Sequence, residues 1–569
     1  MKKLIYIVSI AAMVMATSCG EEYLDTTNLY EKSLESFYQS PQDINEAMSG
    51  VYNAMYTPDV HSMEGLAANL LSDMMLGGGG PDDKSAKNVD SFQDPDEDTY
   101  RSLWVRSYNG ISRANTLIEK TMEADFTEHF FTEEEAEEFK NQAIGEAYFM
   151  RGFFYFRMAK FFGGVPLILS IDDPRDVPRA SMTETFAQIA SDFQAAIELM
   201  PETPIQEIPT SRYGHANKWV AQSYLARAFL FYTGYMTNIE GQSTNELPLA
   251  NEGGSLSQND VLAHLDDIIN NSGHALLSDF RNLWPYSYVN TAAGDTVLPW
   301  AAEEGLQWAG QDGLSPTFGT GNPETMFVVR YAFGDWDFGQ YFNNRLPLFF
   351  GIRDNSMVPF GQGWGWGTVN PILWNNWDDA DTRKEGSILE LGVESQGTQT
   401  YEPNKGDHET GFFNKKYTTI QHDGDDGVRG MFYYLYDMDH GDPMQLWAAQ
   451  DYILMRFADV LLMHSEISET ANGINAVRER AGLDPVGGYS LEALKEERLH
   501  EFAFEGLRWF DLVRWGDVNT AFDFEIDVMN SGVEAKYSVN YRPETKGLVP
   551  IPETEVRLSN GVYEQNPGW

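Results

Sequence analysis

Apolar residues recur at helical spacing in three long stretches of the N-terminal half. In 44–55 they stand at i, i+4, i+7 and i+11, and 104–118 keeps a similar spacing over four turns. The pattern continues in 133–161 and stops at Gly163. Each stretch predicts an amphipathic helix with one face against a core.

Two further helices are predicted before residue 240. Ser181 and Glu184, three residues apart, form a capping box ahead of an apolar pattern that ends before Pro201. Another helix runs from about 216 to 235, and part of it echoes the helix at 133–161: Ala, Arg and Phe at 147, 151 and 153 match Ser, Arg and Phe 76 positions later. The spacing is near twice the period of about 34 residues of tetratricopeptide helix pairs, so we expect a mainly α fold of stacked helix pairs.

Helical periodicity is lost from about 240 to 445, where Gly, Asn and Asp are abundant. This loop-rich region, with Trp447 at its end, holds nine of the fourteen tryptophans. Helices resume afterwards, one of them with Ser490 as its N-cap, and a Pro-rich tail from about 547 is expected to be extended.

Charged residues repeat on one face of the predicted helix after Ser490. The spacing could be an acid/base cluster or a solvated, partly ion-paired stripe, and we expect the stripe because it is the commoner cause of such spacing. These residues are Glu497, Glu501, Glu505, Arg508 and, in the preceding helix, Arg456 and Asp459.

The N-terminus has the features of an export signal. Lys2 and Lys3 precede an apolar run, 4–16, which would span about 20 Å as a helix and is too short for a bilayer core of about 30 Å. Cys19, the only cysteine, follows this run and excludes an intramolecular disulfide. The ending ATSC resembles a bacterial lipobox, although Ala16 replaces the usual leucine, and it implies a lipid anchor at Cys19.

Composition narrows the function classes. The hydrophobic content of 42% and the charged content of 22% are ordinary for a globular protein and exclude a disordered chain. The net charge of −47 repels phosphate backbones, so nucleic acid is not an expected partner. Signatures of zinc proteases, serine hydrolases and phosphate loops are absent from the sequence, and no cofactor is expected. The run DGDDG (423–427) is a weak candidate for a structural calcium ion.

Several blocks together resemble the SusD/RagB family of outer-membrane nutrient-binding, starch-binding-like lipoproteins. The C-terminal blocks are DYILMRFADVLLMHSEISE (451–469), INAVRERAGL (474–483), LKEERLHEFAFEGLRWFDLVRWGDV (494–518) and the ending LVPIPETEVRLSNGVYEQNPGW. The N-terminal blocks are NGISRANTLIE (109–119), EAYFMRGFFYFRMAKFFGGVPLIL (146–169) and PRASMTETFAQIASDFQAAIELMP (178–201). The resemblance is weakest in the loop-rich region, and the join between Glu469 and Asn475 is shorter than in relatives.

The resemblance implies a tetratricopeptide-like helical scaffold with a loop-rich variable region inserted. It also implies a surface lipoprotein of the outer membrane, not an enzyme, that captures a glycan and delivers it to a SusC-like TonB-dependent transporter. The expected parts are a signal peptide (1–18), a lipidated N-terminus and tether (19–42), an N-terminal helical part (43–240), a loop-rich aromatic ligand-binding region (241–445) and a C-terminal helical part with an extended tail (446–569).

A glycan site needs flat rings for the sugar faces and polar groups for the hydroxyls. We expect an aromatic platform in the loop-rich region, although each tryptophan could instead fill the core. The glycine-rich loop 77–92 is a second source of contacts. The candidates are Trp336, Trp374 and Trp377, then Trp364, Trp366 and Asn375, and in the loop Asp82, Asp83 and Asn88.

Two other functions stay open at this point. One is a glycoside hydrolase that uses paired carboxylates. Among 86 acidic residues such a pair must occur somewhere, so its presence in the sequence neither supports nor excludes this function. The other is a binder of peptide or another nutrient that is not a glycan.

Overall fold

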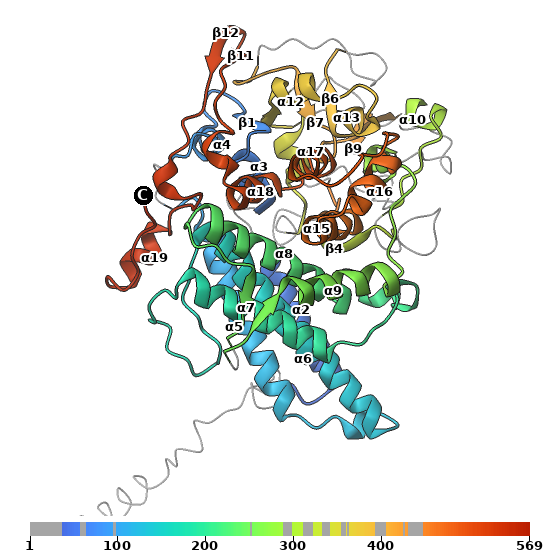
Figure 1. Cartoon of the computed structure of the whole chain (residues 1–569), viewed down its shortest axis with the longest axis vertical. Coiled ribbons are helices and arrows are strands. Elements are labelled where there is room, and N and C mark those ends of the chain that lie inside the picture. Colours follow the sequence, from blue (N-terminus) through green and yellow to red (C-terminus); the bar gives the residue numbers. More distant parts are fainter. Residues whose placement is uncertain are drawn as a thin grey trace, which may run out of the picture.

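The computed structural model arranges the chain in two parts, a stack of long helices below and shorter helices and strands above (Figure 1). Within the described ranges no helix is long and apolar enough to cross a bilayer. The structure describes residues 37–56, 64–94, 98–250, 253–287, 299–310, 322–332, 342–353, 360, 363–392, 405–424, 427–430 and 448–569.

The lower part is a stack of helices that pack against one another in chain order. α5 packs against α6, α6 against α7, α7 against α8, and α8 against α9, while α2 lies against α5 and α6. The predicted stack of helix pairs is therefore confirmed. The bounds are α2 Pro41–Tyr52, α5 Arg101–Glu123, α6 Glu133–Phe162, α7 Met182–Leu199, α8 Lys218–Asn238 and α9 Gln258–Asn271.

Local signals set the ends of these helices. The Ser181 hydroxyl accepts from the Glu184 backbone N–H at 3.2 Å, and the Glu184 carboxylate accepts from the Ser181 N–H at 2.8 Å, so the predicted capping box is present. α6 ends at Gly163, whose φ of 74° suits glycine. The predicted helix boundaries hold where such signals are present.

The two arginines of the sequence echo join neighbouring helices. Arg151 of α6 pairs with Asp192 of α7 at 2.7 Å. Arg227 of α8 pairs with Asp459 of α15 (Phe457–Ser468), with Nε 3.1 Å from the carboxylate. Both aspartates are buried, so these pairs lie between helices and not on the surface.

The upper part contains shorter helices from the C-terminal part of the chain. α16 spans Asn472–Arg480, α17 spans Leu491–Glu501 with the predicted N-cap Ser490, and α18 spans Arg508–Trp515. Phe504 and Gly506 have φ of 66° and 77°, which breaks the helix between α17 and α18. The charged positions 497 to 508 therefore do not lie on one continuous helix face.

The expectation that the charged stripe is solvated is wrong, whereas the expected ion pairing is present. Glu497, Glu501 and Glu505 are 1%, 0% and 5% exposed. Arg383 contacts Glu497 at 2.5 Å and Glu501 at 3.0 Å, and Arg456 contacts Glu505 at 2.8 Å. Burial by itself raises the pKa of Glu501, but the surrounding guanidinium groups hold that pKa well below its ordinary value. The partners come from distant parts of the sequence, which helical spacing does not reveal.

The loop-rich region contains more regular structure than its pattern indicates. α9 was not predicted, although Ser257 and Asp260 form a capping box at its start and Val261, Leu265 and Ile268 form a buried stripe. The tail expected to be extended contains α19 (Glu553–Leu558). Other short helices are α3 Glu64–Leu70, α4 Lys84–Asp90, α10 Pro299–Glu303, α11 Leu346–Phe350, α12 Pro371–Asn376 and α13 Thr382–Ser387.

The strands of the described residues form antiparallel pairs: β1 with β5, β2 with β3, β4 with β10, β6 with β7, β8 with β9, and β11 with β12. The first and third of these pairs join segments far apart in the sequence. The bounds are β1 Met75–Gly78, β2 Glu246–Pro248, β3 Ser255–Ser257, β4 Thr325–Val329, β5 Trp366–Val369, β6 Ile388–Glu390, β7 Phe412–Asn414, β8 Gln421–Gly424, β9 Gly427–Gly430, β10 Tyr452–Arg456, β11 Ile526–Asn530 and β12 Val533–Tyr537.

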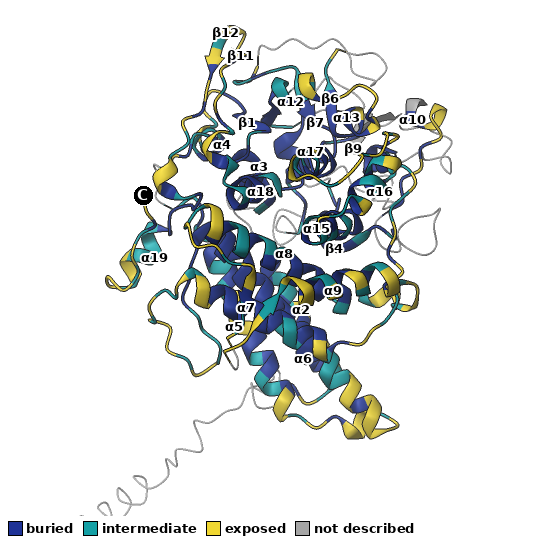
Figure 2. Cartoon of the chain, viewed as in Figure 1, coloured by how far each residue is buried: buried dark blue, intermediate teal, exposed yellow. Residues whose placement is uncertain are grey.

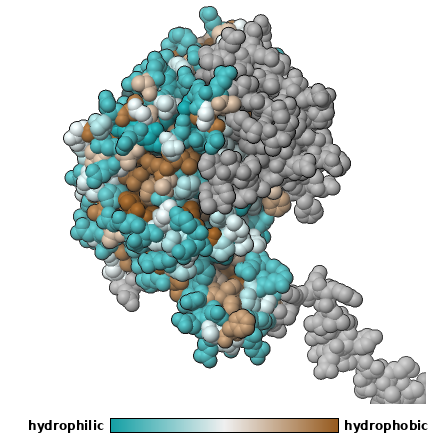
Figure 3. Space-filling model, turned by 90° about the vertical axis from the view of Figure 1, so that its right-hand side faces the viewer, coloured by the Kyte–Doolittle hydropathy of each residue, from teal (hydrophilic) through white to brown (hydrophobic). Residues whose placement is uncertain are grey.

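One apolar core extends through both parts, from Ile44 in α2 to Ile551 before α19. Figure 2 shows the buried residues along the inner sides of the helical stack and around α17 and α18. A smaller cluster joins α15, α16 and α17. Figure 3 shows apolar side chains gathered on one face between the upper and lower parts, with a mostly polar surface around them.

Candidate functional site

The glycine-rich segment 77–80 is held against the loop-rich region by strand pairing. In the β1–β5 pair, Leu76 lies opposite Thr368 and Gly78 opposite Trp366. Gly79 has a φ of 82°, and a Cβ atom there would lie 2.6 Å from the Trp366 ring. The backbone therefore needs glycine to pass this close to the indole.

Arg353 connects the loop after this glycine-rich segment to Trp364, which lies two residues before β5. Its Nη1 donates to the Asp83 carboxylate at 3.0 Å and to the Trp364 carbonyl at 2.9 Å. Asp83 also accepts from the Gly80 N–H at 2.7 Å. The side chains of Arg353 and Asp83 are 33% and 30% exposed, so water and a ligand can reach this pair.

Trp364 is the half-exposed ring of this cluster. It packs against Phe349 at 5.1 Å and against Trp366 at 5.5 Å between ring centroids. Trp366 is only 3% exposed and stacks on Phe349, so it supports Trp364 from inside. Asp83, Arg353 and Trp364, with the exposed Asp82, define what we call the candidate surface.

The three best-ranked tryptophans do not form one platform in the described residues. Trp336 lies outside them. Trp377 is 2% exposed, stacks on His500 at 4.4 Å and donates from Nε1 to Asp381 at 2.9 Å, so it is a core residue. Trp374 is half-buried and stacks on Phe412 at 5.1 Å. Ring burial depends on tertiary contacts, which the abundance of tryptophan in the loop-rich region does not show.

The remaining candidates differ in their surroundings. Asn375 is exposed at the end of α12, next to Trp374. Asn88 is half-buried in α4, and its carbonyl accepts from the Gln93 N–H at 2.8 Å. Sequence reasoning missed Arg353, for which no motif gave a signal.

A buried acid lies beneath the candidate surface. The Asp90 carboxylate accepts from the Gly77 N–H at 2.8 Å and from the Tyr537 hydroxyl. Burial raises the pKa of Asp90 to about 7, and both hydrogen bonds oppose that rise. The neighbouring His408 ring, 4.8 Å from Tyr537, has its pKa lowered to about 4, mainly by burial.

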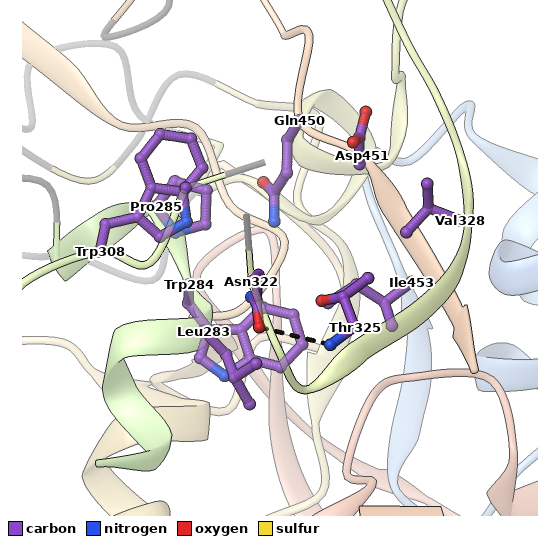
Figure 4. A pocket seen from close by; sticks show the side chains of 11 residues that line it. Leu283, Trp284, Pro285, Trp308, Asn322, Thr325, Val328, Gln450, Asp451 and Ile453 are labelled. Carbon is purple, nitrogen blue, oxygen red and sulfur yellow. Dashed lines mark hydrogen bonds between the residues drawn. The ribbon is translucent and has the colours of Figure 1, made fainter. Parts of the chain in front are cut away.

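Two tryptophans of the loop-rich region line the small pocket of Figure 4. Trp284 and Trp308 stand on one side and Gln450 and Asp451 on the other, and Asn322 accepts from the Thr325 N–H. Its volume of about 20 Å³ suits a water molecule and not a sugar ring. Trp284 is fully buried, so this pocket belongs to the core.

Within the described ranges, no group of three or more His, Cys, Asp and Glu side chains could hold a metal ion. The ends of the DGDDG run lie in the hairpin of β8 and β9, and its residues 425–426 lie outside the described residues. Glu501 and Glu505, two buried carboxylates of the upper part, are ion-paired within the fold.

Comparison with known families matches most of the chain. Residues 22–230 match the family described as "Starch-binding associating with outer membrane", and residues 353–569 match the family described as "SusD family". SusD-like protein P2 of Formosa agariphila is 24% identical, with 94% of each chain covered. A SusD-like protein of Bacteroides ovatus is 23% identical, with 90% of this chain and 83% of that protein covered.

Solved structures share the fold. A laminarin-binding SusD-like protein superposes with a TM-score of 0.69 at 22% identity, covering 94% of this chain and all of that chain. Surface glycan-binding protein A from Bacteroides thetaiotaomicron, in complex with laminarihexaose, gives 0.67 at 18% identity and covers 93% of this chain and all of that chain. The fold is thus a tetratricopeptide-like helical scaffold with a loop-rich region. The chain belongs to the SusD/RagB family.

Proposed function

We propose that this chain is a glycan-binding lipoprotein of the outer-membrane surface. It captures oligo- or polysaccharide and delivers it to a SusC-like TonB-dependent transporter, held to the membrane by lipid at Cys19. Family membership supports this role, as do the relatives named for laminarin binding and for a laminarihexaose complex.

The candidate surface is the observation that carries the proposal. Trp364 offers a ring for the apolar face of a sugar, while Arg353, Asp83 and Asp82 offer a donor and acceptors for its hydroxyls. Phe349 and Trp366 hold the Trp364 ring from behind, so little side-chain freedom is lost on binding.

The other predicted residues have secondary roles in this proposal. Trp374, Asn375 and Asn88 are kept as further ligand contacts, whereas Trp366 supports Trp364 from inside and Trp377 belongs to the core. Trp336 is kept as a ligand contact from the loop-rich region, outside the described residues.

Calorimetry with a panel of oligosaccharides, including laminarihexaose, tests the binding function. We expect at least one glycan to bind and its chain length to stay unchanged on incubation. Trp364→Ala should weaken that binding about tenfold, because a stacking ring contributes about 1 to 2 kcal/mol. Trp569→Ala, a half-buried tryptophan outside the surface, is the matched control.

Three results would count against this proposal. Absence of binding across the panel would favour a nutrient other than a glycan. Release of shortened glycans that stops when one acidic residue is mutated would favour the glycoside hydrolase. The delivery step predicts a large β-barrel protein that copurifies from the native outer membrane in mild detergent, and isolation as a free monomer would contradict it.

A further inference from the structure

A second pocket lies on the helical stack, away from the candidate surface. It opens between α5, the segment 168–175 and the C-terminal segment 555–563, and has a volume of about 460 Å³. This size is within the range of small-molecule sites, unlike the 20 Å³ of the pocket in Figure 4. In Figure 1, α5 and α19 lie in the lower half, while α4 and α12 lie near the top.

Aromatic rings form one side of this pocket. Trp104 is 3% exposed and backs the half-buried rings of Tyr108 and Tyr563, at 5.3 and 6.0 Å between centroids. The Tyr108 hydroxyl donates to the Pro166 carbonyl at 2.8 Å, which fixes that ring. The pocket therefore offers two supported aromatic rings to a ligand.

Several polar side chains of the lining are already satisfied within the fold. Asn115 donates to the Ile168 carbonyl at 2.9 Å and accepts from Arg151 at 2.9 Å. Asp173 accepts from two backbone N–H groups, the nearer at 2.7 Å. Glu555 accepts from Arg101 at 2.9 Å. These groups build the wall and join the C-terminal segment to α5.

Other polar groups of the lining have no such partner. The side chains of Asn109, Ser112 and Arg175 and the hydroxyl of Tyr563 make no hydrogen bond or ion pair within the described part of the chain. They supply an amide, two hydroxyls and a guanidinium around the two rings. A purely apolar ligand would leave these groups unpaired and is therefore disfavoured.

The charge of the pocket lining disfavours a second class of ligand, the anions. Asp173 and Glu555 place two carboxylates beside the single guanidinium of Arg175, in a chain of net charge −47. Because Arg101 also pairs with Glu555, these charges nearly balance, and the lining has no excess of positive charge to hold a phosphate or another anion. Rings for C–H faces, with neutral donors and acceptors for hydroxyls, match a neutral sugar.

We propose that this pocket is a second saccharide site, which takes one or two neutral sugar rings. The inference uses the geometry of the pocket and not the candidate surface, so the two proposals fail separately. A second site on the helical stack would let one molecule hold two segments of a polysaccharide and raise its avidity without tighter binding at either site.

The test uses the full chain with Trp364→Ala, so that the candidate surface is weakened. The probes are five neutral disaccharides: laminaribiose, maltose, cellobiose, lactose and mannobiose. Ligand-observed NMR measures their binding up to about 10 mM, a range that covers a weak site with a dissociation constant near 1 mM. We expect at least one to bind. Adding Asn109→Ala or Tyr563→Ala should weaken that binding about tenfold.

Val562→Ala is the control, because Val562 is exposed next to Tyr563 and does not line the pocket. Its binding should equal that of the parent. Asn109 is exposed, so its truncation should leave the fold intact, which circular dichroism verifies. Lack of binding by all five probes, or binding that both pocket variants leave unchanged, would overturn the second site whatever the outcome at the candidate surface.

Discussion

At the scale of single residues, the burial of a side chain separates residues that look alike in the sequence. Trp364 and Trp377 both stand in the Gly- and Asn-rich run that predicted a platform, yet Trp364 is half-exposed and Trp377 donates to Asp381 in the core. The run could predict aromatic rings near polar groups. It could not predict which ring faces outward, because that depends on partners such as His500, more than a hundred residues away.

Asp90 is a residue whose ionisation should affect stability. Its carboxyl is 2% exposed, and burial raises its pKa to about 7 from the ordinary 3.8. Between these values the unfolded chain has lost the proton that the folded chain keeps, so stability falls as pH rises through this window and stays low above it. Tyr537 stays neutral because burial raises its pKa well above the ordinary value.

Asp90→Asn should remove this dependence while keeping an acceptor for the Gly77 N–H. We compare the unfolding free energy of the variant with that of wild type at each pH. This difference should be about 2 kcal/mol more favourable to the variant at pH 8 than at pH 5. Urea unfolding at both pH values measures the difference. An equal effect at the two pH values would show that Asp90 does not titrate in this window.

At the scale of elements, long periodic helices with caps could be predicted and elements joined by distant contacts could not. α5, α6, α7 and α8 follow from apolar spacing and breakers. The β1–β5 pair joins residues almost three hundred positions apart and leaves no local pattern. It also places part of the expected N-terminal helical part beside the loop-rich region, so the strand pairing crosses our expected boundary at residue 240.

Gly79 tests how β1 supports the candidate surface. Gly79→Ala places a methyl group 2.6 Å from Trp366 at a φ of 82°, so it should cost strain and overpacking together, about 2 to 4 kcal/mol. Gly482 has a φ of 80° with nothing within 4 Å of its Cβ position, so Gly482→Ala should cost only about 1 kcal/mol. Denaturant unfolding measures both, and equal costs would contradict the packing of Gly79 on Trp366.

The buried ion pairs around α17 should behave differently from surface pairs. Arg456 is 1% exposed and contacts Glu324 at 2.8 Å and Glu505 at 2.8 Å. Arg456→Met leaves these buried carboxylates with one cation each, Arg480 for Glu324 and Lys416 for Glu505, and should cost about 3 to 5 kcal/mol. Lys120→Met breaks an exposed pair with Glu123 and should cost less than about 1 kcal/mol. Thermal unfolding that ranks the two variants alike would reject this distinction.

At the scale of the whole molecule, composition and the predicted N-terminal signal indicate the cellular compartment, and the fold shows the architecture. A net charge of −47 and a single cysteine at the end of the predicted export signal favour an acidic surface protein without disulfides. The two matched segments leave residues 231–352 between them, within the loop-rich region where the sequence resemblance is weakest. Ligand preference is expected to vary in that region, because loops tolerate change more than the helical stack does.

Membrane attachment through Cys19 is the prediction that belongs to this scale. The anchor that we propose is lipid attached to Cys19. Each buried methylene contributes about 0.8 kcal/mol, and two or more acyl chains hold a protein on a membrane stably. Wild type should incorporate labelled fatty acid and sediment with the outer membrane. Cys19→Ala should lose the label and become soluble while it still binds the glycan in calorimetry, because Cys19 lies outside both proposed sites. A variant that keeps its membrane association would mean that other contacts hold the protein there.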